Sequence, residues 1–288
     1  MAKTDKAKDV AQERQFLISR RSLLKTGAAA TAVAGAVVVS KPRPAMADPG
    51  DPDATVKWGM LIDLRKCVGC ETCSVACKTQ NDVPLGVFRS SVKALEPAGE
   101  TFPNVTRDQL PWLCNHCDDA PCIADCPVEE IPASLTMPNG DEIGYCKKAT
   151  YKRPDGLVLV DQDRCIGCGL CIPLCPYNVR FRHPTKETSN GSSKVTDKCD
   201  FCVNRISNGA KPACVQTCPH NARMIGNLLD PASNISAAIA AADHDIQRIY
   251  AYASDPGSGP NVYYVVPSGT DVDTRFEDGT DTKTRATS

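Results

Sequence analysis

The most informative stretch of this sequence is residues 163–176, which reads Asp163-Arg164-Cys165-Ile166-Gly167-Cys168-Gly169-Leu170-Cys171-Ile172-Pro173-Leu174-Cys175-Pro176. Its spacing is C-x2-C-x2-C-x3-C-P, in which three thiolates hold one [4Fe–4S] cube and the fourth reaches a neighbouring cube. Gly167 and Gly169 allow the backbone to fold closely over a cluster. Pro176 suits the first position of a helix, so a helix is predicted to start after Cys175. The stretch predicts two adjacent clusters.

Three further cysteine groups repeat this pattern along the chain. The first group is Cys67, Cys70, Cys73 and Cys77, the second is Cys114, Cys117, Cys122 and Cys126, and the fourth is Cys199, Cys202, Cys214 and Cys218. Every group ends in C-x3-C, and a proline follows in all but the first, where Lys78 stands instead. Sixteen of the 17 cysteines belong to these groups, which indicates an internally repeated metal-binding unit.

Other cysteine chemistries fit the spacing less well. Zinc sites use two separated pairs of ligands, a pattern that only the fourth group resembles by itself. A C-x2-C-x2-C loop cannot pair its own cysteines in a relaxed disulfide. No C-x2-C is followed by histidine, so no c-type haem attachment is predicted. Iron–sulfur clusters are therefore favoured over zinc and over disulfides.

The N-terminus has the features of a targeting segment. Residues 19–25, Ser-Arg-Arg-Ser-Leu-Leu-Lys, resemble the twin-arginine export signal, and an uncharged run covers residues 26–40. Residues 45–47, Ala-Met-Ala, have the form of a signal-peptidase site. A membrane anchor is the alternative, but the run of 15 residues is shorter than the roughly 20 that a spanning helix needs. Residues 1–47 are therefore predicted to be a cleaved signal peptide, with the mature protein in the periplasm.

Charge and motif content exclude several functions. The first 47 residues hold nine Lys/Arg and three Asp/Glu, so with a whole-chain charge of −1 the remainder carries −7. An acidic body without a basic stripe argues against nucleic acid as a partner. After the N-terminal segment no run of 18 apolar residues occurs, so the mature form has no predicted transmembrane helix of its own. No nucleophile–base set, phosphate loop or dinucleotide motif is visible, so no substrate chemistry is expected of this chain.

The chain resembles the four-cluster iron–sulfur (beta) subunits of membrane-associated molybdopterin oxidoreductases, such as the dimethyl sulfoxide, polysulfide, thiosulfate and tetrathionate reductases. A ferredoxin that accompanies periplasmic nitrite reductase is similar. The resemblance covers roughly residues 56–266. Besides the cysteines, it rests on the segments 111–117 (PWLCNHC), 151–161 (YKRPDGLVLVD), 198–202 (KCDFC), 214–219 (CVQTCP) and 260–264 (PNVYY).

The resemblance implies a nested pairing of the groups, first with fourth and second with third. One pair of clusters takes Cys67, Cys70, Cys73 and Cys218, then Cys199, Cys202, Cys214 and Cys77. The other pair takes Cys114, Cys117, Cys122 and Cys175, then Cys165, Cys168, Cys171 and Cys126. Spacing alone leaves a sequential pairing open, first with second and third with fourth.

The implied fold class is α+β, with two ferredoxin-like modules that each hold two clusters among short strands and short helices after each Cys-Pro. Short strands are predicted at residues 58–63, 157–161 and 262–266. The outer module joins residues 48–110 to 183–266, and the inner module spans 111–182. Residues 129–148 are an insertion relative to the family, with a turn at Asn139-Gly140 and the seventeenth cysteine, Cys146, as a free thiol. Residues 267–288 are predicted to be a disordered tail.

Several residues beside the cysteines have two interpretations. His116 and His220 either donate hydrogen bonds to a cluster or only pack in their loops. Four cations, Lys66, Lys78, Arg164 and Lys198, either offset cluster charge or remain solvated at the surface, and the solvated state is the expectation. Residues 230–234 are predicted to cap a helix that continues through Ile235 and Ile239.

The implied function is electron transfer. Four clusters would relay electrons between a molybdopterin catalytic subunit and an integral membrane subunit that reacts with quinone or carries a cytochrome. One alternative is a ferredoxin subunit of a periplasmic membrane complex without molybdenum, as in dissimilatory sulfite reduction. Another is a binding protein stabilised by zinc or disulfides.

Overall fold

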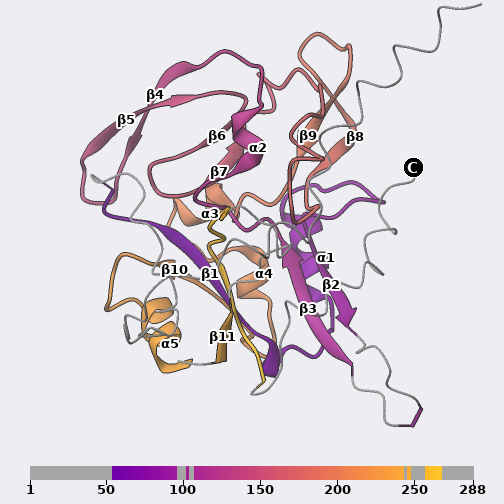
Figure 1. The fold of residues 1–288 in the computed structure, drawn as a ribbon, viewed down its shortest axis with the longest axis vertical. Coiled ribbons are helices and arrows are strands. Elements are labelled where there is room, and N and C mark those ends of the chain that lie inside the picture. Colours follow the sequence, from indigo (N-terminus) through magenta and orange to yellow (C-terminus); the bar gives the residue numbers. More distant parts are fainter. Residues whose placement is uncertain (1–53, 96–101, 104–106, 243–244, 248–256, 268–288) are drawn as a thin grey trace, which may run out of the picture. The chain divides into compact units, whose positions relative to one another are not determined.

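A computed structural model describes residues 54–95, 102–103, 107–242, 245–247 and 257–267 (Figure 1). All four cysteine groups lie within these ranges. The predicted signal peptide, residues 1–47, and nearly all of the predicted tail, residues 268–288, lie outside them, so both stay predictions. None of the helices in these ranges is long and apolar enough to cross a membrane.

The largest sheet has the strand order β10-β1-β12-β11. Its strands are β1 (Trp58–Asp63), β10 (Arg223–Asn227), β11 (Ile246–Gln247) and β12 (Val262–Val265). β1 pairs with β10 in antiparallel and with β12 in parallel orientation, so the sheet joins segments separated by about 200 residues of sequence. The strands predicted at 58–63 and 262–266 are confirmed, the second one residue shorter.

The two faces of β1 and β12 pack against different partners, because side chains alternate across a strand. Leu61 and Tyr263 face α5 (Asn234–Ala242), whose Ile235 is fully buried against them. The Ser233 hydroxyl accepts a hydrogen bond from the Ser236 N–H (3.2 Å) and caps this predicted helix. On the other face, Met60 and Tyr264 belong to the main core.

The remaining strands form four antiparallel pairs. These are β2 (Ser90–Leu95) with β3 (Asp108–Leu113), β4 (Ile131–Thr136) with β5 (Glu142–Lys147), β6 (Thr150–Lys152) with β7 (Val158–Val160), and β8 (Phe181–Glu187) with β9 (Lys194–Asp197). The β4–β5 pair is the predicted insertion, and Gly140 has a φ of 93° in its turn. Short strands and short helices therefore make up the described fold, as expected, while the boundaries of two modules stay a prediction.

Two short helices, α2 (Pro121–Ala124) and α4 (Ala213–Gln216), precede Cys-Pro pairs, and the prediction that helices follow these pairs was wrong. The other short helical segments beside the cysteines are η1 (Leu64–Lys66), α1 (Thr72–Gln80) and α3 (Val203–Ile206). After Cys175 the chain forms only a turn, in which the Asn178 N–H donates to the Cys175 carbonyl (3.0 Å). The proline ring disfavours helical geometry in the residue before it, so α2 and α4 end two residues ahead of Cys126-Pro127 and Cys218-Pro219.

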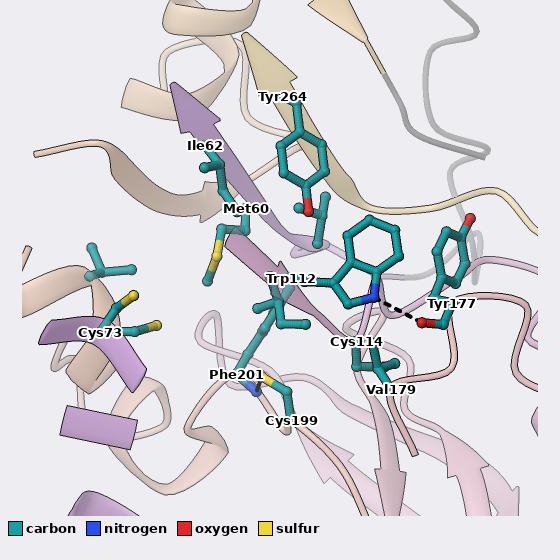
Figure 2. Packing of buried hydrophobic residues seen from close by; sticks show 14 of the residues in the cluster. Met60, Ile62, Cys73, Trp112, Cys114, Tyr177, Val179, Cys199, Phe201 and Tyr264 are labelled. Carbon is teal, nitrogen blue, oxygen red and sulfur yellow. Dashed lines mark hydrogen bonds between the residues drawn. The ribbon is translucent and has the colours of Figure 1, made fainter. Parts of the chain in front are cut away.

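The main core combines apolar side chains with cysteine sulfurs (Figure 2). Trp112 is 4% exposed, and its Nε1 donates to the Tyr177 carbonyl (2.8 Å), which connects β3 to the turn after Cys175. Tyr264 donates its hydroxyl to the Pro111 carbonyl (2.9 Å). These buried donors connect β3, which leads into the second cysteine group, to β12 and to the turn after the third group.

A buried ion pair adds to this cohesion. The Lys57 ammonium lies 2.9 Å from a carboxylate oxygen of Asp118, and their side chains are 2% and 13% exposed. Lys152 lies 3.2 Å from the same carboxylate. Burial raises the pKa of Asp118, but the hydrogen bonds from Asn261 and Lys57 lower it more, so the net direction is down and the carboxylate stays ionised.

Replacing Asp118 with alanine should destabilise the fold by about 3–5 kcal/mol, because two lysines lose this buried carboxylate. The matched control is Glu187→Ala, which breaks an exposed pair with Lys194 (2.8 Å) and should change stability little. Midpoints of guanidinium unfolding, followed by circular dichroism on anaerobic protein, measure both changes. Equal midpoints for the two variants would contradict the importance of the buried pair.

Candidate metal centres

Each cysteine group begins with a C-x2-C loop in which the residue before the second cysteine is left-handed. This residue is Gly69, His116, Gly167 or Phe201, with φ of 71°, 46°, 68° and 54°, and in the fourth group Cys202 is left-handed as well. Glycine adopts this conformation freely, whereas His116 and Phe201 adopt it at a steric cost that surrounding structure must offset. The shared conformation shows that the four groups form the same local turn.

Two cavities are lined by cysteines from different groups. Site I is lined by Cys67, Cys70, Cys73 and Cys218. Site III is lined by Cys114, Cys117, Cys122 and Cys175. In both sites, three cysteines of one group meet the last cysteine of another.

A third cavity and a buried cluster of sulfurs complete the set. Site IV is the cavity lined by Cys126, Cys165, Cys168 and Cys171. Site II consists of Cys77, Cys199, Cys202 and Cys214, all buried. At site II the Asn81 amide lies 3.6 Å from the Cys77 sulfur and 3.7 Å from the Cys202 sulfur, and Cys199 and Cys214 are electrostatic neighbours of Cys77. The structure thus groups the cysteines in nested rather than sequential sets.

Short helices and turns carry the cysteines that cross between sites. α1 holds Cys73 of site I and, one helical turn later, Cys77 of site II. α4 holds Cys214 of site II, and Cys218 of site I follows it. Residues four apart lie on the same face of a helix, so α1 presents sulfur to both sites at once. Cys122 and Cys126, and then Cys171 and Cys175, repeat this exchange between sites III and IV.

Burial raises the pKa of cysteine thiols at sites II and III. Burial and the neighbouring sulfurs of Cys214 and Cys202 raise the pKa of the Cys77 thiol to about 12. Burial and the Cys114 sulfur raise the pKa of Cys175 to about 11. Metal ligation requires thiolates, so a metal group held at site II or site III would have to supply the positive charge that keeps these cysteines deprotonated.

The donor sets fit a cubic iron–sulfur group. All 17 cysteines are free of disulfides, and each of the four sets offers the four thiolates that one cube takes. In the described ranges no three His, Cys, Asp or Glu side chains converge on a single metal position.

The sites differ in exposure. Cys70 of site I and Cys168 of site IV are exposed, whereas the cysteines of sites II and III are buried apart from the half-buried Cys175. Val68 beside site I is 57% exposed, and Ile166 beside site IV is 50% exposed. Sites I and IV are therefore open to partner molecules, and sites II and III are enclosed.

An aromatic contact connects the enclosed sites. The rings of His116 and Phe201 lie 3.9 Å apart, centroid to centroid, and they occupy equivalent left-handed positions in the second and fourth groups. His116 is fully buried, and its Nδ1 accepts the Val158 N–H (3.0 Å), which places the ring proton on Nε2. His116 is thus part of the boundary between sites II and III, whereas His220 is an exposed residue at the rim of site I.

Lys198 departs from the expectation of a solvated surface cation. It is 2% exposed, and its ammonium donates to the carbonyls of Val158 and Cys199. Lys66 is exposed as expected, whereas Lys78 and Arg164 are half-buried and donate to backbone carbonyls. Lys198 is buried because its long side chain crosses from the fourth group to β7, a contact that local sequence does not reveal.

Cys146 is exposed on β5 and joins none of the four sites.

Sequence reasoning missed two buried arginines, Arg180 and Arg223. They are 3% and 4% exposed, and each lines a cysteine cavity, Arg180 at site III and Arg223 at site I. A signal was present in the sequence, because both arginines stand five residues after a cysteine in the same pattern, C-P-x-N-x-R. Compared side by side, the third and fourth groups would have shown it.

Comparison with known proteins identifies an iron–sulfur domain family. The family model of the 4Fe-4S dicluster domain matches residues 105–228. The tetrathionate reductase B subunit of Salmonella typhimurium is 38% identical over 209 residues, which cover 73% of this chain and 72% of the relative. The arsenate respiratory reductase iron-sulfur subunit ArrB of Shewanella is 33% identical over 251 residues, covering 73% and 96%. Protein NrfC of Escherichia coli is 37% identical over 212 residues, covering 73% and 81%.

These similarities extend well beyond the matched domain, and the relatives named as reductase subunits are iron–sulfur or B subunits. The chain therefore belongs to the [4Fe–4S] iron–sulfur subunits of molybdopterin-type oxidoreductases, and it is an electron-transfer protein.

Proposed function

We propose that this chain holds four [4Fe–4S] clusters, one at each of sites I–IV, and relays single electrons through them in that order. The observation that carries the proposal is the nested grouping of sixteen cysteines into four sets of four. Each cube takes four cysteine thiolates, which is the number that each set offers. The clusters supply the one-electron redox chemistry, and the chain sets their spacing and surroundings.

The order of the relay follows from shared elements. α1 and α4 connect site I to site II, and the segments around Cys122–Cys126 and Cys171–Cys175 connect site III to site IV. The His116–Phe201 contact connects site II to site III. Electrons therefore enter and leave at the exposed sites I and IV, while the enclosed sites pass them on without contact with solvent.

The open ends suit two different protein partners. One would be a molybdopterin catalytic subunit, and the other an integral membrane subunit that reacts with quinone or carries a cytochrome. Relatives named as iron–sulfur or B subunits of tetrathionate, arsenate and dimethyl sulfoxide reductases support this assignment over a complex without molybdenum. In this arrangement the chain acts on no substrate itself, since the catalytic subunit carries that chemistry.

The location of the complex follows from the N-terminal segment. A twin-arginine signal exports a folded chain, so the cysteines bind iron in the cytoplasm before they meet an oxidising compartment. The chain then lies in the periplasm, peripheral to the cytoplasmic membrane and attached through its membrane subunit.

Iron and acid-labile sulfide analysis tests the number of clusters. Anaerobically purified protein should contain about sixteen iron atoms and about sixteen sulfides per chain, as four cubes require.

Cys168→Ser should lower the iron content or alter one cluster signal in paramagnetic resonance, because Cys168 belongs to site IV. Cys146→Ser is the matched control, another exposed cysteine, and should keep the full content. A colourless, zinc-loaded protein would end the proposal.

The nested ligand sets predict which signals a cysteine variant affects. Cys77→Ser should alter the same paramagnetic signal as Cys199→Ser, because both residues belong to site II. Cys122→Ser, at site III, should alter a different one. If Cys77→Ser and Cys122→Ser changed the same signal, the sequential pairing would hold instead.

The twin-arginine assignment predicts how export fails. Replacing both Arg20 and Arg21 with lysine should leave the chain in the cytoplasm with its clusters intact, because the signal depends on the arginine pair. Cell fractionation followed by immunoblotting measures the location, and Arg14→Lys, a change outside the motif, is the control. Unimpaired export of the double variant would disprove the assignment.

A further inference from the structure

Two segments of the chain share a pattern that the cluster ligands alone do not require. They are Cys175-Pro176-Tyr177-Asn178-Val179-Arg180 and Cys218-Pro219-His220-Asn221-Ala222-Arg223. In both, the asparagine N–H donates to the cysteine carbonyl, at 3.0 Å and 3.2 Å, and the asparagine is left-handed, with φ of 48° and 50°. The same turn therefore places an arginine at the same distance along the chain from a ligand of site III and a ligand of site I.

Arg180 lies between sites III and IV. It lines the cavity of site III, and its charged neighbours are the sulfurs of Cys122, Cys114 and Cys175 from that site and of Cys171 from site IV. One amino group, Nη1, lies 3.3 Å from the Thr150 hydroxyl oxygen, to which it donates. Nε and Nη2 are buried and have no partner among the protein atoms.

Arg223 takes the corresponding place between sites I and II. It lines the cavity of site I, and its neighbours are Cys73 from that site and Cys214 and Cys199 from site II. Nη2 donates to the Ser90 hydroxyl (3.1 Å), and Nη1 is buried without a partner.

Among the residues that the structure describes, no carboxylate pairs with either arginine, although a buried cation ordinarily needs one. Arg89, which is also largely buried, forms ion pairs with Asp197 (2.9 Å) and Asp200 (3.1 Å). In the described ranges neither Arg180 nor Arg223 forms an ion pair with a carboxylate. Arg180 donates to the Thr150 hydroxyl, and Arg223 donates to the Ser90 hydroxyl and to the Cys214 sulfur. An unpaired buried charge costs several kcal/mol. The negative charge that stabilises these two cations must therefore come from the sulfur-ligated sites.

We propose that Arg180 and Arg223 are positioning residues for electron transfer, each donating its unpartnered N–H groups to the sulfurs of the two sites that it borders and raising their reduction potentials. The inference rests on the proposed function. One electron added at a site increases its negative charge, and a fixed guanidinium nearby stabilises that charge without giving up its proton. Hydrogen bonds to cluster sulfurs act in the same direction.

The test is a redox titration of the anaerobic full-length protein, followed by paramagnetic resonance, with signals assigned through Cys70→Ser for site I and Cys168→Ser for site IV. Arg180→Gln should lower the reduction potentials of sites III and IV by at least about 59 mV, which corresponds to a tenfold change in the equilibrium constant for one-electron reduction. The potentials of sites I and II should stay unchanged. Arg223→Gln should do the reverse. Lys66→Gln removes an exposed charge at the rim of site I and, as the matched control, should shift no potential by as much.

Iron content separates the possible outcomes. A wild-type protein with fewer than four clusters contradicts the proposed function, whereas full loading with unchanged potentials in both glutamine variants contradicts only the role of the arginines. Equal shifts at all four sites would also contradict it. If a glutamine variant loses iron, the lysine variant at the same position distinguishes a role of the positive charge from a role in packing alone. If Arg180→Lys or Arg223→Lys restores the iron content and near-native reduction potentials, the positive charge is what matters. If neither quantity is restored, the arginine serves only packing.

Discussion

The fold depends on cysteine sulfurs that cross from one site to the next. Every group contributes three sulfurs to its own site and one to a neighbour, and the crossing residues lie on the same short helices and turns as the residues that stay. α1 and α4 are too short to be stable as isolated helices. In the proposed arrangement, sulfur ligation would fix their position and replace much of the apolar packing that a chain with 5% aromatic residues would otherwise need.

The enclosed centre of the molecule contrasts with its two open sites. Where the open sites have glycine in the C-x2-C turn, the enclosed sites have His116 and Phe201, which adopt an unfavourable backbone conformation and pack against each other. Their rings fill the space between sites II and III, and the surrounding bonds from Val158 and Asn261 hold His116 in place. The unfavourable backbone conformation of these two residues is thus offset by the packing of their rings and by these hydrogen bonds.

Much of this arrangement was predictable from the sequence, because ligand spacing and strand patterns are local signals. The strand at Trp58–Asp63, the turn at Asn139-Gly140 and the helix capped at Ser233 all appeared where the residues indicated. The predicted position of helices relative to Cys-Pro was wrong: α2 and α4 end before Cys126-Pro127 and Cys218-Pro219, where proline disfavours helical geometry in the residue that precedes it. The burial of Lys198, Arg180 and Arg223 depends on contacts between distant segments, and no single stretch of sequence shows these.

The nested sets also impose an order on biosynthesis. Sites III and IV draw all their cysteines from residues 114–175, whereas site II needs Cys214 and site I needs Cys218. A ribosome that has delivered Cys175 has therefore made every ligand of the inner pair, while Cys67 and its neighbours still await partners about 150 residues downstream. During translation the earliest cysteines are the last to be completed, so the nascent chain must keep these thiols reduced and free of foreign metals until its C-terminal third emerges.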